Sequence, residues 1–162
     1  MSGLESLPPL LKPGLEVVFV GTEPGRDSLA AGHYYASSSN SFYSDLHDVG
    51  FTDRLLWPEQ YRELLAYGIG LDDVYDDAAG LRHRIEATRP HAVCFNSKQA
   101  LERFAGVIDT PWRGSAASEH ARFRVAILVW AVPDSSGRAA GHRASRLSLL
   151  KELRQQIAST LG

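Results

Sequence analysis

The chain has one cysteine among 162 residues and no hydrophobic run as long as a membrane span. A single thiol, Cys94, excludes an internal disulfide and is too few for an iron-sulfur cluster or a cysteine-based zinc site. A membrane helix needs roughly 18 consecutive apolar residues, and the N-terminus lacks the charged and apolar regions of a signal peptide. We therefore expect a cytoplasmic protein, associated with the nucleoid if it is bacterial.

Metal-binding patterns are also lacking. The six histidines are scattered, and no pair has the helical spacing of a metalloprotease or the clustering of a zinc site. Cys94 lies in the apolar run 92–95, which is typical of a buried, unreactive thiol. We expect no structural metal and no cofactor.

A strong excess of positive charge is absent as well, since the formal net charge is −2. The charge is nevertheless divided: residues 1–80 hold 4 Lys/Arg and 13 Asp/Glu, and residues 81–162 hold 13 and 6. Such a division can place a basic face against phosphate, or it can be an unevenly charged solvated surface. With 44% hydrophobic and 22% charged residues, the chain predicts one soluble domain, with residues 1–15 as a lead-in, and we expect a monomer.

Apolar runs alternate with helical patterns along the chain. Buried strands are predicted at 16–20, near 69–71, at 91–95 and over 123–132, the last as a central strand covered on both faces. Helices are predicted at 40–49, from Pro58, and at 80–88, 97–104 and about 142–160. This alternation predicts an α/β fold, a three-layer α/β/α sandwich with a mainly parallel central sheet.

Ligands of an open parallel sheet bind at the carboxyl ends of its strands, which directs attention to the loop 21–25. This loop, Gly-Thr-Glu-Pro-Gly, follows the first strand and carries Glu23. Taken alone, the pattern fits an ordinary glycine-stabilised turn. The sequence has neither the Gly-x-Gly-x-x-Gly series of a dinucleotide site nor a phosphate-binding loop.

The order of several short segments is more specific than any one of them. The loop 21–25 is followed by 32–36 (GHYYA), 40–43 (NSFY), 65–71 (LAYGIGL), 95–100 (FNSKQA) and 132–137 (VPDSSG). Together they resemble the mismatch-specific uracil and thymine DNA glycosylases of the uracil-DNA glycosylase superfamily. That resemblance spans nearly the whole chain and implies an enzyme that removes a base flipped out of DNA.

Two carboxylates are candidates for the chemistry that this resemblance implies. Hydrolysis of the glycosidic bond needs a positioned water and stabilisation of positive charge on the sugar. The family holds the water with an Asn of a Gly-x-Asn-Pro-Gly loop, where this chain has Glu23, which can act as a general base if it stays ionised. Asp73 follows a strand on the same side of the predicted sheet and is the second candidate; Asp72 more simply caps a helix or faces solvent.

The same resemblance implies residues that bind the flipped base. Tyr35 matches the aromatic residue on which the base stacks; the alternative is a core or surface tyrosine. The backbone at Gly21 and Thr22 can approach the base closely. Asn96 can either hydrogen-bond the base or cap the helix that follows it.

DNA contacts are implied near residue 136. Ser136 and Gly137 match the loop that enters the DNA stack, and Arg138 occupies its wedge position. Arg143 and Arg146, early in the last helix, are candidates for phosphate contacts. Alternatively, both arginines lie on a solvated helix face and have no role in DNA binding.

The resulting hypothesis is a monofunctional DNA glycosylase that hydrolyses the N-glycosidic bond of uracil or a related damaged base in DNA, initiating base excision repair. Two alternatives stay open at this point. One is a non-catalytic module that binds flipped or mismatched bases, and the other is a hydrolase of free modified nucleosides or nucleotides.

Overall fold

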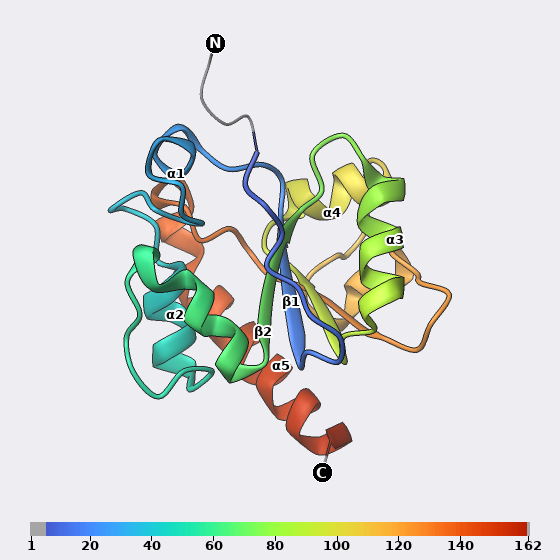
Figure 1. The fold of residues 1–162 in the computed structure, drawn as a ribbon. Helices are drawn as coiled ribbons and strands as arrows, with labels where there is room; N and C mark the ends of the chain where they lie inside the picture. The colour runs from blue at the N-terminus through green and yellow to red at the C-terminus, as the bar shows by residue number, and fades with distance from the viewer. Residues whose placement is uncertain (1–5, 162) are drawn as a thin grey trace.

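A computed structural model describes residues 6–161 and contains one parallel β-sheet (Figure 1). Its four strands lie in the order β2-β1-β3-β4. They are β1 (Val17–Gly21), β2 (Ile69–Asp73), β3 (Ala92–Phe95) and β4 (Leu128–Ala131). All three strand pairings are parallel, so the carboxyl ends of all four strands lie on the same side of the sheet, at the end where the strands finish.

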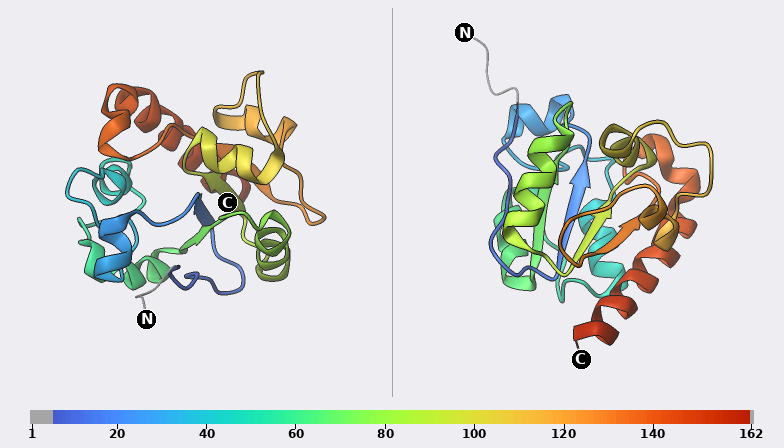
Figure 2. Two further views of the ribbon diagram at one scale, coloured as in Figure 1. Left: turned by 90° about the horizontal axis from the view of Figure 1, so that it is seen from above. Right: turned by 90° about the vertical axis from the view of Figure 1, so that its right-hand side faces the viewer.

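Helices cover both faces of this sheet. On one face lie α2 (Phe42–Val49), the 3-10 helix η1 (Pro58–Tyr67) and α5 (Arg143–Leu161); on the other lie α3 (Ala78–Thr88), α4 (Lys98–Ala105) and η2 (Gly114–Glu119). Each face has its own hydrophobic core, because alternate residues of every strand point to opposite sides. The predicted three-layer sandwich is confirmed. Figure 2 shows the same layers from two further directions.

Two short helices, α1 (Arg26–Ala31) and η3 (Gly137–His142), follow the carboxyl ends of β1 and β4. Neither was predicted, because each is only 6 residues long and lies in a segment rich in small or polar residues. A single helical turn of this kind depends on its neighbours more than on its own sequence. Both helices therefore extend the loops at the edge where a ligand is expected.

The prediction of a long central strand over 123–132 is wrong. The strand β4 contains only Leu128–Ala131, and it lies at the edge of the sheet. Before it, the Phe123 ring stacks on Phe104 at a centroid distance of 5.2 Å. The run is apolar because other elements cover it: the Trp130 indole nitrogen, for example, donates a 3.0 Å hydrogen bond to the carbonyl of Leu149 in α5.

Most other elements confirm the predicted patterns. Helix α2 buries Phe42 and Leu46 and ends at Gly50, whose φ of 89° is favourable for glycine. The N-cap of α2 is Ser41 and not the predicted Asn40, which lies one residue earlier and accepts a 3.0 Å hydrogen bond from the Phe42 amide. Cys94 is fully buried, and burial raises the pKa of its thiol to about 12.

The lead-in segment belongs to the core. Leu10 forms an isolated antiparallel bridge with Leu71 at the outer edge of β2, and Leu7 is buried nearby.

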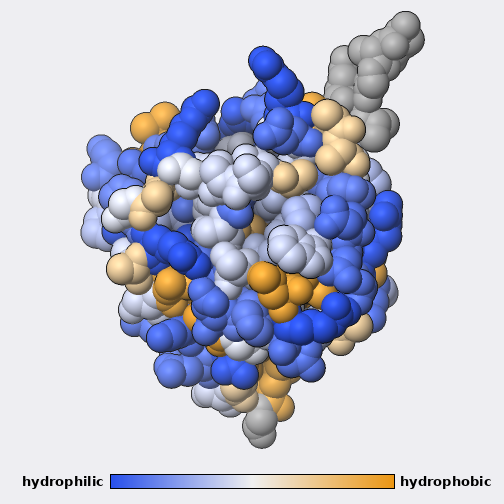
Figure 3. All heavy atoms as spheres, turned by 90° about the vertical axis from the view of Figure 1, so that its left-hand side faces the viewer, coloured by the Kyte–Doolittle hydropathy of each residue, from blue (hydrophilic) through white to orange (hydrophobic). Residues whose placement is uncertain are grey.

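Among residues 6–161, no helix is both long and apolar enough to cross a membrane. Viewed from the α2 side, the surface is mostly hydrophilic with small separate apolar groups (Figure 3).

Candidate active site

A cleft of about 780 Å³ opens at the carboxyl ends of the strands. The loops after β1, β3 and β4 contribute to it, as do the last residue of β2, Asp73, and the segment before α2. The lining residues whose contacts or charges bear on the chemistry of the cleft are Gly21, Thr22, Glu23, Arg26, Tyr35, Ser39, Asp73, Asn96, Gln99, Asp134, Ser136, Gly137 and Arg138. The cleft thus brings together every predicted base-binding residue and both predicted carboxylates.

Asp73 is the buried carboxylate of this cleft. It is the last residue of β2 and is 4% exposed. Its Oδ2 is buried and finds no hydrogen-bond partner among the residues that the structure describes. A buried polar atom without a partner is uncommon in folded proteins and indicates a place for a water molecule or ligand.

The surroundings of Asp73 favour its protonated form. Burial raises the pKa of this carboxyl to about 7, with further increases from the negative charges of Asp72 and Glu23. The Gly21 amide and the Arg84 guanidinium act in the opposite direction. Asp73 therefore changes its charge near neutral pH, as suits a group that takes part in proton transfer or charge stabilisation.

Gly21 is in close contact with Asp73. A Cβ atom added at Gly21 would lie 2.6 Å from Asp73 Oδ1 and 3.2 Å from the Tyr35 hydroxyl oxygen. A larger residue cannot occupy this position unless one of these groups moves. The close approach explains why glycine ends β1 here.

Tyr35 contributes an aromatic ring to the cleft. Its ring stacks on Phe42 with a centroid distance of 4.1 Å, and its backbone has a φ of 55°, which is uncommon for a residue other than glycine. The hydroxyl is buried without a partner among the described residues. Burial, together with the Asp73 charge, raises the pKa of Tyr35 well above its usual value, so the hydroxyl stays protonated.

Glu23 lies differently from Asp73, at the rim of the cleft. Its side chain is 54% exposed, and its Oε1 accepts a 2.9 Å hydrogen bond from Arg103 of α4. The carboxylate is thus held by an arginine at the surface and is largely solvated. The predicted catalytic role of Glu23 stays a prediction, and the geometry favours Asp73 as the principal carboxylate.

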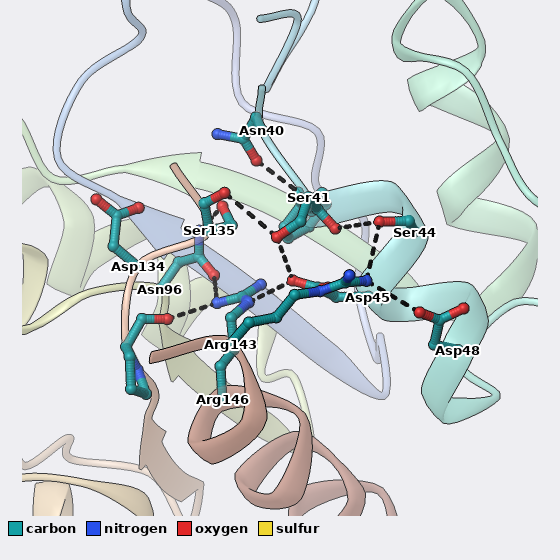
Figure 4. Close-up of polar contacts among 12 residues, drawn as sticks. Asn40, Ser41, Ser44, Asp45, Asp48, Asn96, Asp134, Ser135, Arg143 and Arg146 are labelled. Carbon is teal, nitrogen blue, oxygen red and sulfur yellow. Dashed lines mark hydrogen bonds and ion pairs between the residues drawn. The ribbon is translucent and has the colours of Figure 1, made fainter. Parts of the chain in front are cut away.

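Asn96 has structural partners as well as a place in the cleft (Figure 4). Its Oδ1 accepts a 2.7 Å hydrogen bond from Arg146, and its Nδ2 donates one of 3.1 Å to Ser135 Oγ. Because a guanidinium can only donate, it fixes the Asn96 oxygen toward Arg146. The second hydrogen of Nδ2 is left for another acceptor. Ser97, not Asn96, caps α4 through a hydrogen bond from the Ala100 amide.

The prediction that Arg146 contacts DNA phosphate is wrong in this structure. The Arg146 side chain is only 1% exposed, and its Nε donates a 2.6 Å hydrogen bond to Asp45, which is fully buried in α2. The same guanidinium also binds the Pro133 carbonyl at 2.8 Å. Arg146 therefore joins α2, α5 and the loop after β4 (Figure 4).

Arg143 takes part in this network at its solvent-facing side. Its Nε binds Asp45 and its Nη2 binds Asp48, both at 3.0 Å, and its side chain is 43% exposed. A contact with phosphate would compete with these carboxylates. The predicted DNA contact of Arg143 stays a prediction.

The loop that follows β4 is held in a defined shape at the cleft. The Asp134 carboxylate accepts hydrogen bonds from the amide and the hydroxyl of Ser136, both at 3.1 Å. Gly137 lies against Ser39, since a Cβ added there would lie 2.8 Å from the Ser39 side chain. Arg138 follows on an exposed stretch, as a residue that enters a DNA stack must.

The charges at the cleft do not match the expected basic face. Its lining includes four acidic side chains and two arginines; these are Glu23, Asp27, Asp73, Asp134, Arg26 and Arg138. The arginines of the second half are spread over several elements instead. Arg26 and Gln99 were not predicted as site residues. Arg26 starts α1, which was itself not predicted. Gln99 lies in the segment 95–100, where only Asn96 was predicted to bind the base.

No group of three or more potential metal ligands occurs among residues 6–161. The cleft combines an aromatic ring, amide and hydroxyl groups and one buried carboxylate with exposed acidic and arginine side chains. Together with the parallel sheet, these features define an α/β protein with a polar cleft suited to a planar, hydrogen-bonding ligand. Such a site supports recognition of a nucleobase.

Comparison with known proteins identifies the family. The model of the uracil DNA glycosylase superfamily matches residues 8–158, so the chain belongs to that superfamily. A similar fold occurs in a candidate uracil DNA glycosylase from Methanosarcina acetivorans, solved by solution NMR, with a TM-score of 0.60 and 18% sequence identity over 93% of this chain and 98% of that one. Membership supports DNA glycosylase activity in general, with DNA as the partner.

Proposed function

We propose that this protein is a monofunctional DNA glycosylase that removes uracil or a related damaged base, flipped out of DNA, to begin base excision repair. The observation that carries the proposal is the Asp73 carboxylate, whose buried Oδ2 in the cleft has no hydrogen-bond partner among residues 6–161. No covalent intermediate is required, because water can attack the sugar while the base leaves.

The residues of the cleft have distinct roles in this proposal. The flipped base stacks on the free side of Tyr35, whose other side packs on Phe42. The remaining hydrogen of Asn96 Nδ2 donates to a carbonyl of the base. Ionised Asp73 orients the attacking water and stabilises the positive charge that develops on the sugar. Arg138 fills the space that the extruded nucleotide leaves in the duplex.

A panel of labelled duplexes tests the activity and its base specificity. Duplexes with uracil, a thymine mismatch or hypoxanthine are incubated with the protein, and abasic sites are detected by alkaline cleavage. We expect release of at least one base, and a loss on the order of 100-fold in Asp73→Asn. The matched control is Asp76→Asn, which changes an exposed aspartate outside the cleft and should keep the full rate.

Binding without release from any duplex would identify a base-binding module and overturn the enzymatic proposal. The excess of carboxylates at the cleft specifically favours another candidate, a hydrolase of free nucleosides, because an uncharged nucleoside avoids repulsion between phosphate and these side chains. Including free deoxyuridine and deoxyinosine in the assay separates the two functions. Release from nucleosides alone would establish the second candidate.

A further inference from the structure

The residue before Asp73 is also a buried aspartate, and it faces the other side of the sheet. Asp72 is 2% exposed, and its carboxylate binds Arg84 of α3 through two hydrogen bonds of 2.8 and 3.1 Å. Because successive residues of a strand point to opposite faces, Asp72 lies outside the cleft while Asp73 lies within it. The role of this buried ion pair is not explained by the cleft itself.

The backbone connects this ion pair to Asp73. β2 is an edge strand, and the outward amide of Leu71 is satisfied by the Leu10 carbonyl. Two residues further on, the outward amide of Asp73 donates a 2.8 Å hydrogen bond to Asp72 Oδ1. The Arg84 guanidinium also lies 3.4 Å from the Asp73 carbonyl oxygen. The side chains of Asp72 and Arg84 therefore form hydrogen bonds with the outer backbone groups of Asp73, which in the middle of a sheet would pair with a neighbouring strand.

We propose that the Asp72–Arg84 ion pair is a positioning device, which fixes the backbone of Asp73 and sets the charge state of its carboxylate in the cleft. This inference rests on the proposed function in assigning the reaction step to Asp73. Neither Asp72 nor Arg84 lines the cleft, so both act through Asp73. Each member contacts the Asp73 backbone directly, since Asp72 accepts the hydrogen bond from its amide and Arg84 lies against its carbonyl.

The electrostatics around Asp73 give the proposal a distinctive signature. The Asp72 charge raises the pKa of Asp73, whereas the Arg84 charge lowers it. Glu23, from the loop after β1, also raises it. Tyr34, Tyr35 and Tyr75 lie close enough for the Asp73 charge to raise their own pKa values, and they stay neutral across the relevant range.

The test is the pH dependence of single-turnover base release in Asp72→Asn and Arg84→Met, between about pH 5 and about pH 9. The wild-type rate should rise through a midpoint near the pKa of Asp73. Asp72→Asn keeps an oxygen that can accept the hydrogen bond from the Asp73 amide but removes the charge, so the midpoint should fall by roughly half a unit or more. Arg84→Met should raise the midpoint, by a smaller amount. The control is Arg82→Met, on the same helix, which should leave the midpoint unchanged.

Positioning is tested separately with Asp72→Ala, which removes the acceptor of the Asp73 amide. We expect kcat to fall on the order of 10-fold with little change in KM. A role in folding alone would lower the melting temperature of the variants without moving the midpoint. Midpoints that shift in the same direction, or not at all, in Asp72→Asn and Arg84→Met would overturn the proposal.

A second readout does not depend on activity. NMR titration of the 13C-labelled Asp73 carboxyl reports its pKa directly in the wild type and in each variant. Opposite shifts in the two charge variants support the positioning device even if no base is released, in which case the proposed function alone fails. If Asp72→Asn does not fold, Arg84→Met compared with Arg84→Lys, which keeps the charge, provides the same test, and equal pKa values in those two would overturn the proposal.

Discussion

Gly21 and Asp73 pack so closely that a single methyl group at Gly21 would lie 2.6 Å from the Asp73 carboxylate oxygen. They are register partners on the neighbouring strands β1 and β2, at the point where both strands end. The contact places the loop after β1 against the one buried carboxylate that lines the cleft within the described part of the chain.

Gly21→Ala should therefore impair base release more than folding. The added methyl group forces Asp73 or Tyr35 to move, and a displacement of about 1 Å in a catalytic group can reduce a rate on the order of 100-fold. Single-turnover release and melting temperature are measured together. Gly141→Ala is the control, since a Cβ there also meets nothing within 4 Å and the residue does not line the cleft; equal effects of the two substitutions would refute the close contact.

Asp73 should make the protein less stable as the pH rises through neutrality. Its folded pKa of about 7 lies above the value of about 3.9 for an unfolded aspartate. The folded state therefore binds more protons between these values, and the stabilisation, complete below about pH 4, is lost as the pH rises through 7.

Asp73→Asn removes this penalty and should be more stable than the wild type at pH 8 by on the order of a few kcal/mol, with a much smaller difference at pH 5. Urea denaturation at the two pH values measures the free energies of unfolding. Asp76→Asn should show no such pH-dependent gain. A stability difference for Asp73→Asn that does not change between the two pH values would contradict the assigned pKa.

Arg146 should contribute more to stability than Arg143, although both bind Asp45. Truncation of Arg146 to Ala leaves the fully buried Asp45 without its main partner, which costs about 3–5 kcal/mol for a buried ion pair. Arg143→Ala should cost about 1 kcal/mol or less because that side chain is 43% exposed. Denaturant titration measures both values, and similar costs would argue against the buried network in Figure 4.

Arg138 should affect DNA binding rather than folding. Replacement of this exposed residue with Ala should weaken binding with little change in the slope of the logarithm of affinity against the logarithm of salt concentration, because the proposed role is insertion into the stack. A slope reduced by about 1 would instead indicate a contact with phosphate. Arg124→Ala, which precedes the amino end of β4, is the control, and an equal loss there would contradict a role specific to the loop.

The sequence predicted the elements whose signal is local. β1, β3 and α4 were found because continuous apolar runs and helical spacing come from burial on one or both faces. The position of β4 could not be found this way, since an edge strand covered by η2 and α5 has the same apolar pattern as a central one. Phe123 adds to the apolar run for a different reason, since its ring packs on Phe104 of α4.

The site was predicted in its location but not in its internal arrangement. The alternation of strands and helices placed the loops after β1, β2 and β3 at one edge, which is how Glu23 and Asp73 were both selected. Their different environments depend on partners far along the chain: Arg103, 80 residues away, holds Glu23 at the rim. The burial of Arg146 likewise depends on Asp45, 101 residues away, and no local pattern reports such a pairing.

The most direct test of the central claim compares Asp73→Asn with Glu23→Gln in single-turnover release of the preferred base, at saturating enzyme and near pH 8. Asp73→Asn should lose on the order of 100-fold in rate while still binding DNA, and Glu23→Gln should lose less than about 10-fold. A full rate in Asp73→Asn together with a large loss in Glu23→Gln would contradict the central claim, because the rim carboxylate would then be the one that acts on the substrate.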